Sequence, residues 1–202
     1  MEIKQGSFYY NKKKVFEDVN IKTNKGDIIA IVGSNGSGKT TLLKCMANIL
    51  QLTSGELIIK NDSRSVYVPD VPLAYEYLTG YEYLAFIQSI IKDRDSKKIE
   101  STLKLYTLYE ERNKLIKNYS HGMKQKLSLC AALLDNDIEY ILLDEPLTGV
   151  DKQSQSIIIE NLKKLSFENK TIILTTHQIG SLQKMCNKIY CMDSKNEVHI
   201  DV

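Results

Sequence analysis

The sequence predicts an α/β fold with a mainly parallel sheet, an antiparallel β part near the N-terminal end and an inserted helical part. Three observations lead to this prediction. Short, almost continuously apolar runs at 27–32, 140–143 and 171–174 are typical of strands buried on both faces. Segments with helical spacing separate these runs, as in βα units. Between 74 and 116 the apolar spacing is helical only, which indicates an insertion.

The composition is that of one ordinary globular domain, with 202 residues, 43% hydrophobic and 26% charged. The 27 basic and 25 acidic residues leave a net charge of +2, so we expect no nucleic-acid partner. The 4 cysteines form no CxxC pair, which argues against a zinc site or a disulfide framework and indicates a reducing compartment.

No apolar run approaches the length of about 18 residues that a membrane helix needs. The start of the chain, MEIKQGS, lacks the basic and apolar pattern of a signal sequence. We therefore expect that any role at a membrane requires a partner subunit.

The elements follow in a simple order. Residues 3–10 and 15–23 alternate with a period near two and predict antiparallel strands around a polar turn. The lysine run at 12–14 in that turn is expected to be solvated. The predicted helices cover 39–50, 123–134 and 153–165. We expect one domain over 1–202, made of an antiparallel β part with the first half of the core at 1–72, a helical part at 73–122 and the rest of the core at 123–202.

Residues 33–40, GSNGSGKT, match the phosphate-loop pattern GxxxxGK[ST] directly after a buried strand and before a helix. The glycines let backbone N–H groups approach phosphate oxygens, and the helix offers its positive end. Lys39 supplies a charge for the terminal phosphates, and the Thr40 hydroxyl can ligate Mg²⁺. The expected nucleotide contacts are Gly33, Ser34, Asn35, Gly36, Ser37, Gly38, Lys39, Thr40 and Thr41. The motif predicts a nucleoside triphosphate site in a P-loop NTPase core.

The strand at 140–143 ends in two carboxylates, within YILLDEP. Asp144 is placed to hold Mg²⁺, and Glu145 to orient and deprotonate an attacking water. The alternative is an acidic pair that serves a turn, as carboxylates at strand ends often do.

Between these motifs lies YSHGMKQK at 119–126, ahead of an apolar helix. Taken alone, SHG before a helix is an N-cap with Ser120 as the capping residue. In this order and spacing the set resembles the nucleotide-binding domain of ATP-binding cassette (ABC) proteins, from Glu2 to about Asp193. The usual signature of that family, LSGGQ, corresponds here to YSHGM.

The resemblance implies a RecA-like P-loop core with an antiparallel β subdomain and an inserted helical subdomain. It implies ATP and Mg²⁺ as cofactors, with Lys39, Glu145 and His177 as catalytic residues and His177 at the γ-phosphate. Two such domains pair head to tail, so that Ser120 and Gly122 of one reach the ATP of the other. Further implied positions are Tyr10 on the adenine ring, with Tyr9 as the competing candidate, and Asp151 at the dimer interface, where it also suits an N-cap.

Two positions depart from the family pattern. Asp70 stands where the family usually has Gln, and as a shorter, charged group it could still meet Mg²⁺ or the attacking water. His121 and Met123 replace the usual Gly and Gln of the signature, whereas Ser120 and Gly122 are kept.

The function that the resemblance implies is that of a cytoplasmic ATPase subunit, peripheral on the inner face of the cell membrane. It would dimerise with an identical or different subunit and drive a membrane permease, with a peptide, bacteriocin or drug as the exported cargo. The tyrosines near Asp70 either fill the helical part or anchor the permease: Tyr75, Tyr77, Tyr81 and Tyr83. The alternatives are a soluble ABC ATPase that acts on nucleic acid or ribosomes, and a nucleotide-gated module with little turnover.

Overall fold

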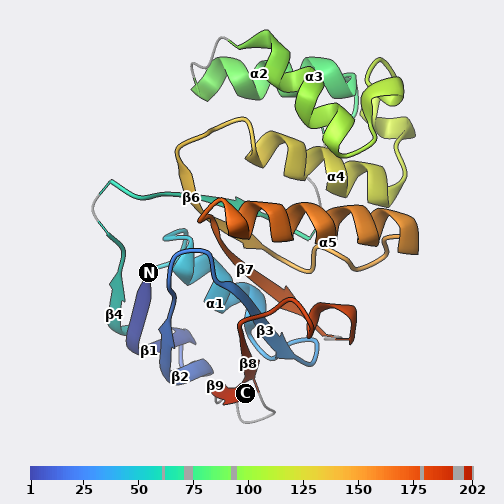
Figure 1. Cartoon of the computed structure of the whole chain (residues 1–202). Helices are drawn as coiled ribbons and strands as arrows, with labels where there is room; N and C mark the ends of the chain where they lie inside the picture. The colour runs from blue at the N-terminus through green and yellow to red at the C-terminus, as the bar shows by residue number, and fades with distance from the viewer. Residues whose placement is uncertain (61, 71–74, 92–94, 178–179, 193–197, 202) are drawn as a thin grey trace.

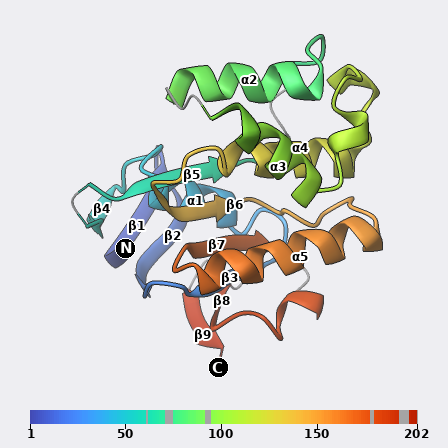
Figure 2. The same cartoon turned by 45° about the horizontal axis from the view of Figure 1, so that its top comes forward.

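The computed structural model describes the chain except for residues 61, 71–74, 92–94, 178–179, 193–197 and 202, and it confirms the α/β class (Figure 1). An antiparallel sheet lies beside a larger, mainly parallel sheet, and a group of helices lies at one end of the molecule. Figure 2, in which the top is turned forward, shows the same helical group above the larger sheet. The boundary predicted at 72 lies outside the described residues, and the one at 122 stays a prediction.

The antiparallel sheet has the order β2-β1-β4, with β1 at Glu2–Tyr10, β2 at Lys13–Lys22 and β4 at Ser54–Ile58. In the β1–β2 pair, Phe8 lies opposite Phe16, and both side chains are buried. The alternating pattern therefore places one face of the hairpin on the core, as expected from its period of two. Because β4 is mostly exposed, its sequence carries no such apolar alternation.

The larger sheet has the order β5-β6-β7-β3-β8-β9, and its neighbours are parallel except for β8 and β9. Its strands are β3 (Ile28–Gly33), β5 (Arg64–Val68), β6 (Ile138–Leu143), β7 (Thr171–Thr176), β8 (Lys188–Met192) and β9 (Val198–Asp201). Because β3, β6 and β7 are parallel neighbours, their carboxyl ends share one edge of the sheet. The phosphate loop, Asp144 and His177 follow these ends directly.

The helices lie on both faces of this sheet. The α-helices are α1 (Lys39–Met46), α2 (Gly80–Ile91), α3 (Ser96–Leu105), α4 (His121–Ala132) and α5 (Lys152–Phe167). Short 3₁₀ turns are η1 (Tyr109–Glu111), η2 (Ile116–Asn118) and η3 (Gly180–Leu182). The expected helical part is present as α2, α3 and the two turns that follow, and α4 lies between it and α5 (Figure 1).

Cap residues move the helix ends from their predicted positions. The helix predicted to reach Leu50 ends at Met46, and Asn48 follows in the left-handed region with φ 57°. The helix predicted from Met123 begins at His121, because the Ser120 side chain accepts a hydrogen bond from the Met123 N–H. Asp151 caps α5 in the same way through the Ser154 N–H.

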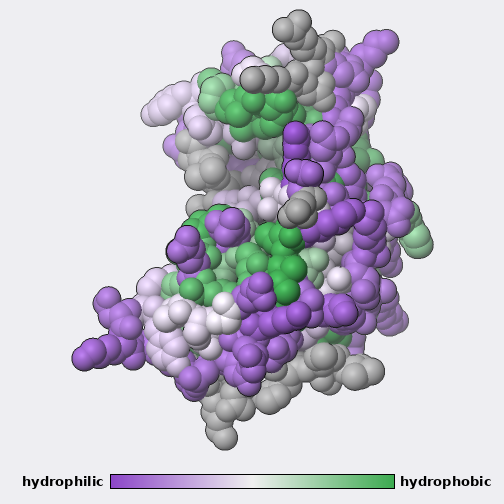
Figure 3. All heavy atoms as spheres, turned by 90° about the vertical axis from the view of Figure 1, so that its left-hand side faces the viewer, coloured by the Kyte–Doolittle hydropathy of each residue, from purple (hydrophilic) through white to green (hydrophobic). Residues whose placement is uncertain are grey.

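Both faces of the larger sheet are packed, which explains the continuous apolar runs. Along β6 and β7, Leu143 and Leu174 face one cluster with α4 and α5, whereas Leu142 and Ile173 face a second cluster with α1 and the antiparallel sheet. Each fully buried leucine or isoleucine contributes about 1.5–3 kcal/mol of transfer free energy. Figure 3 shows apolar surface on the helical part and on the core, with an indentation between them. No helix in the described part of the chain is long and apolar enough to cross a membrane.

Candidate nucleotide site

The phosphate loop joins β3 to α1 in a conformation that requires glycine at two positions. Gly38 has φ 101°, and a Cβ there would lie 2.8 Å from Val15 Cγ1. A Cβ on Gly33 would lie 2.7 Å from the carbonyl oxygen of Met192 in β8. The loop can therefore pass close to β2 and β8 only because these residues lack side chains.

Lys39 is the first residue of α1, and its side chain folds back over the loop. Its ammonium donates to the carbonyl oxygens of Gly33 at 2.9 Å and Ser34 at 3.1 Å. The same Nζ lies 3.4 Å from Glu145 Oε1, although only 6% of Lys39 is exposed. A buried cation is thus held at the position where the loop can receive an anion.

Asp144, at the end of β6, accepts hydrogen bonds from hydroxyl groups on other strands and on α1. Thr40 Oγ1 donates to Asp144 Oδ1 at 3.0 Å, and Thr175 Oγ1 donates to the same oxygen at 2.6 Å. The Tyr67 hydroxyl donates to Oδ2 at 3.1 Å. Burial, followed by the charge of Asp144, raises the pKa of Tyr67, so this phenol stays a donor. Neutral donors therefore fix the carboxylate in place.

Glu145 is held by both its backbone and its side chain. Its φ of 47° lies in the left-handed region that non-glycine residues rarely adopt, and its N–H donates to Thr175 Oγ1 at 2.9 Å. Thr148 Oγ1 and His177 Nδ1 each lie 2.9 Å from Glu145 Oε2. Burial alone would raise the pKa of Glu145, but these hydrogen bonds and the Lys39 charge outweigh it and lower the pKa below its ordinary value. The carboxylate is therefore ionised at neutral pH.

These groups open onto a cavity of about 560 Å³. Its lining residues are Tyr10, Lys13, Lys14, Val15, Asn35, Gly36, Gly38, Lys39, Thr40, Thr41, Asp70, Glu145, Thr148 and His177. Tyr10 is 53% exposed at its rim, whereas the Tyr9 hydroxyl donates to Glu17 Oε1 at 2.6 Å. The structure thus places Tyr10, rather than Tyr9, beside the phosphate loop.

Asp70 follows β5 and lines the same cavity, although it belongs to a different motif from Asp144 and Glu145. Burial raises the pKa of Asp70, and the charges of Asp144 and Glu145 raise it further against the opposing effect of His121 and His177. Three carboxyl groups therefore share one region of the site, where a cation would relieve their repulsion.

The signature segment lies outside this cavity lining and packs on the loop after Glu145 instead. His121 Nε2 lies 3.0 Å from the Thr148 carbonyl oxygen. A Cβ on Gly122 would lie 3.4 Å from Asp151 Oδ2, so the start of α4 and the start of α5 are close neighbours. Of the described residues that line the phosphate-loop cavity, none comes from 120–122.

The residues present fit a magnesium nucleotide. The Ser37 hydroxyl is buried in the loop and has no hydrogen-bond partner, and a Cβ on Gly36 would meet nothing within 4 Å, so this face of the loop has room for phosphate oxygens. Thr40 and Asp144 present adjacent oxygens, the donor type that Mg²⁺ prefers. Within the described ranges, no group of three or more His, Cys, Asp or Glu forms a metal cage, which suits an ion that takes its other ligands from phosphates and water.

Several site residues are absent from the sequence prediction. Lys13 and Lys14, expected to be solvated in a turn, line the cavity, because the antiparallel sheet brings their turn beside the phosphate loop. Thr148 lies between Glu145 and Asp151, which are both predicted site residues, and could have been proposed from its spacing of three after Glu145. Tyr67 and Thr175 reach Asp144 from neighbouring strands, and the sequence has no signal for that register.

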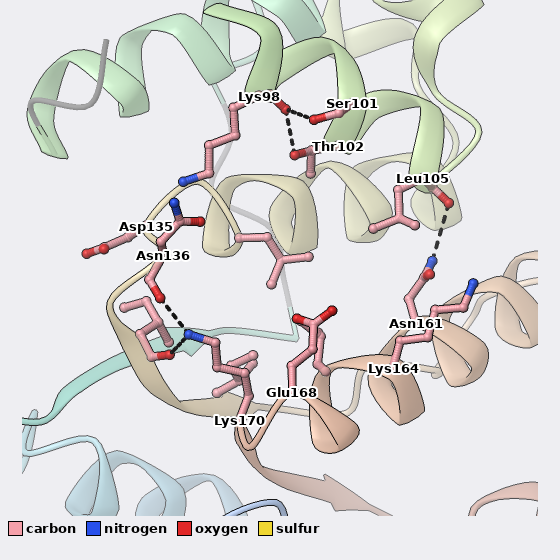
Figure 4. A pocket seen from close by; sticks show the side chains of 14 residues that line it. Lys98, Ser101, Thr102, Leu105, Asp135, Asn136, Asn161, Lys164, Glu168 and Lys170 are labelled. Carbon is pink, nitrogen blue, oxygen red and sulfur yellow. Dashed lines mark hydrogen bonds between the residues drawn. The ribbon is translucent and has the colours of Figure 1, made fainter. Parts of the chain in front are cut away.

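A second cavity of about 510 Å³ lies between α3, α5 and the segment before β6 (Figure 4). Two of its lysines donate to backbone oxygens: Lys98 bonds to the Leu134 carbonyl, and Lys170 to the carbonyls of Asn136 and Ile138, both at 2.5 Å. The Lys98 bond joins the helical part to the core, whereas the Lys170 bonds lie within the core, and we assign this cavity no ligand.

Comparison with known proteins gives a consistent result. The ABC transporter family model matches residues 16–148. The chain is 31% identical to the bacitracin transport ATP-binding protein BcrA of Enterococcus faecalis, over 91% of this chain and 63% of BcrA. It is also 31% identical to a probable metal transport system ATP-binding protein of Thermotoga maritima, over 98% of this chain and 83% of that protein. A solved structure of the ATP-binding subunit of an ABC transporter matches the fold with a TM-score of 0.88 at 24% identity, over 100% of this chain and 89% of the other.

Proposed function

Since this chain belongs to the ABC transporter ATP-binding family, whose members hydrolyse ATP to power transport, we propose that it is the ATPase subunit that drives a separate membrane permease. The observation that carries the proposal is that two pairs of side chains, one suited to Mg²⁺ and one suited to phosphate and water, lie side by side at the phosphate-loop cavity. Thr40 meets Asp144 at 3.0 Å and Lys39 meets Glu145 at 3.4 Å. A metal-binding pair and a base beside a phosphate-binding cation are what phosphoryl transfer to water requires.

ATP would enter the cavity with its adenine ring on Tyr10 and its phosphates along 33–41. The Lys39 ammonium would then leave Glu145 and bind the terminal phosphates. Lys13 and Lys14, which also line the cavity, would attract the negatively charged nucleotide as it approaches. Thr40 and Asp144 would hold Mg²⁺, with Asp70 on the same side of the cavity. When bound, Mg²⁺ neutralises charge on the phosphate oxygens.

The base for hydrolysis is Glu145, which would take the proton of the attacking water. Its ionised state at neutral pH suits that task, because a base must be free to accept a proton. Thr148 and His177 hold one carboxylate oxygen, so the other can turn from Lys39 toward water. His177 also lines the cavity, where it would contact the terminal phosphate.

The active form would be a head-to-tail dimer with an identical or related subunit. Ser120 caps α4, and the backbone of Gly122 lies in the first turn, so this helix start can bind an anion from a partner. Residues 120–122 do not line the cavity of their own chain. In a head-to-tail dimer they would instead face the ATP that is bound to the phosphate loop of the second chain. Asp151, next to Gly122, would lie at the same interface.

The permease would dock at the indentation between the helical part and the core. A groove of about 160 Å³ lies there between β5, α2 and α4, and its lining includes Val66, Pro69, Tyr83 and Ile87. On α2 the side chains of Phe86 and Ile90 are exposed, whereas Tyr83 is 8% exposed and belongs to the core. The apolar surface on either side of the indentation suits a short amphipathic segment (Figure 3). Such docking would keep this chain on the cytoplasmic face of the membrane.

For the cargo, we propose export of a peptide, bacteriocin or drug, supported by the similarity to BcrA, a bacitracin transport ATP-binding protein. The Thermotoga relative, described as a probable metal transport protein, supports metal as the competing cargo at equal identity. Because the cargo path belongs to the permease, assays of the reconstituted pair with a labelled peptide and with a metal ion would distinguish the two.

The test of the proposal is detergent purification of the tagged chain from its own cells, followed by an ATPase assay with and without Mg²⁺. We expect one integral membrane protein to co-purify and Mg²⁺-dependent turnover to be present. Changing Phe86 and Ile90 to Ser should release the membrane protein, whereas Phe167→Ser, which removes a still more exposed aromatic side chain on α5, should not. Recovery of ribosomes or nucleic acid would favour the soluble alternative, and ATP binding without turnover would favour a gated module.

A further inference from the structure

A chain of hydrogen bonds joins the start of α4 to the carboxylate of Glu145. The His121 ring nitrogen Nε2 lies 3.0 Å from the Thr148 carbonyl oxygen. The hydroxyl of the same threonine donates to Glu145 Oε2 at 2.9 Å. One residue, Thr148, is therefore held by His121 through its backbone and holds Glu145 through its side chain.

The chemistry of this contact fixes the donor. A carbonyl oxygen only accepts, so His121 Nε2 must carry the hydrogen, and both the Nε2–H tautomer and the imidazolium satisfy this. The bond therefore persists whether the ring is neutral or charged.

The backbone beside Thr148 is shaped to receive the ring. Gly149 has φ 67°, and a Cβ at that position would lie 3.3 Å from His121 Cδ2. A side chain there would crowd the imidazole and would also strain the backbone. The contact thus has two independent supports, a hydrogen bond at Thr148 and a close approach at Gly149.

We propose that His121 is a positioning residue for Glu145, acting through Thr148. This inference rests on the proposed function, because it assigns His121 a role in hydrolysis by that base. The glycine that usually stands at this signature position has no side chain and cannot make the contact. The substitution is therefore a device of this chain that stiffens the loop carrying Thr148, and with it the direction of one carboxylate oxygen.

The test compares His121→Ala with His121→Gln. Glutamine Nε2 is separated from Cβ by as many bonds as histidine Nε2, so the amide can still donate to the Thr148 carbonyl. We expect His121→Ala to lower kcat roughly 10-fold while ATP still binds the chain's own phosphate loop with the parental affinity, because His121 does not line that cavity and the change affects the orientation of the base. His121→Gln should recover most of the loss. Since His121 is exposed, neither change should shift the thermal unfolding temperature beyond that of Lys124→Ala, a control in the same helix turn that breaks an ion pair with Glu76.

A double-mutant cycle identifies the route. Thr148→Val removes the hydroxyl but keeps the carbonyl, so His121→Ala should have no further effect on kcat in that background. Multiplicative losses would overturn the action through Thr148, and equal kcat in the parent and His121→Ala chains would overturn the positioning role alone. A parent chain without ATP turnover would instead overturn the proposed function, and the role of His121 with it.

Discussion

The Lys39 ammonium lies 3.4 Å from Glu145 Oε1, and the two side chains are only 6% and 12% exposed. The residue that should grip the terminal phosphate is thus paired with the residue that should activate water. Such a buried pair is a weak source of net stability, because its desolvation cost offsets its attraction. A phosphate that enters the loop would compete with Glu145 for Lys39, which would free the carboxylate for the water.

The pair leads to a first prediction, on Glu145→Gln. The amide keeps the size of the side chain and an oxygen acceptor for Thr148 and His177, but it cannot take a proton. Turnover should fall about 10²-fold or more, while ATP still binds and traps a dimer. Turnover by phosphate release and dimer formation by size-exclusion chromatography with ATP would check this, and a variant that hydrolyses ATP at the parental rate would remove Glu145 from the role of base.

Lys39→Ala, unlike Glu145→Gln, should weaken ATP binding itself. It removes the phosphate-binding charge and leaves the buried Glu145 carboxylate without its cation, so ATP affinity should fall about 10-fold or more. Equilibrium binding of a fluorescent ATP analogue would measure the loss. Lys44→Ala, a lysine in the last turn of the same helix, serves as the control and should bind as the parent does. Unchanged affinity in Lys39→Ala would contradict the assignment.

The core strands could be predicted because each is buried on both faces, which leaves a continuous apolar run in the sequence. Strands β4, β8 and β9 could not be predicted in this way. Strand β4 is mostly exposed, and β8 and β9 take their places only through pairing with β3 and with each other. Their formation depends on partners far along the chain, and a local pattern cannot encode that.

The site shows the same division. Loop residues 33–40 and Asp144–Glu145 are contiguous in sequence, so spacing alone predicts them. Thr175 meets Asp144 because β6 and β7 pair with Leu143 opposite Leu174, and a shift of one residue would turn the threonine away. Tyr67 depends in the same way on the register of β5 with β6.

A further prediction distinguishes the two adjacent tyrosines that could stack on the adenine ring. Tyr10 lines the cavity, whereas Tyr9 is bound to Glu17. Tyr10→Ala should weaken ATP binding by about 1–3 kcal/mol, the range for loss of one base stack, and Tyr10→Phe should keep it. Tyr9→Ala is the matched control and should leave the Kd unchanged. Isothermal titration of the three variants would decide, and the reverse ranking would assign the ring to Tyr9.

A prediction on pH follows from Asp70. Burial, and then the charges of Asp144 and Glu145, raise its pKa above the ordinary value of 3.8, so the folded protein disfavours its ionised form. Ionised Asp70 therefore lowers the free energy of unfolding above the raised pKa, and it has no effect below 3.8. Without nucleotide or Mg²⁺, Asp70→Asn should raise Tm at pH 7, and the gain should shrink and vanish as the pH falls through this range. A gain that is equal at all pH values, or absent at pH 7, would contradict the argument.

The last prediction concerns whether the signature acts on its own chain or on a partner. Residues 120–122 pack on the loop after Glu145 and do not line their own phosphate-loop cavity, so the proposed dimer places them against the partner's ATP. A dimer of Lys39→Ala chains and a dimer of Ser120→Arg chains should both be inactive. In the first, every site has an altered phosphate loop, and in the second every site has an altered signature. In a mixed dimer one site combines the intact phosphate loop of the Ser120→Arg chain with the intact signature of the Lys39→Ala chain. Random mixing in equal amounts should then restore about a quarter of the parental ATPase activity, because about half of the dimers are mixed and each has one intact site of two.

The control for this experiment mixes Lys39→Ala with Glu145→Gln. Both changes lie in the half of the site that one chain supplies to its own nucleotide, so neither site of the mixed dimer is whole and no activity should return. Differently tagged chains purified in tandem would prove that mixed dimers form. Recovery in the first mixture alone requires a site shared between two chains. Equal recovery in both mixtures, or none in the first despite proven mixing, would contradict that arrangement and leave Ser120 with the capping role that the structure gives it at the start of α4.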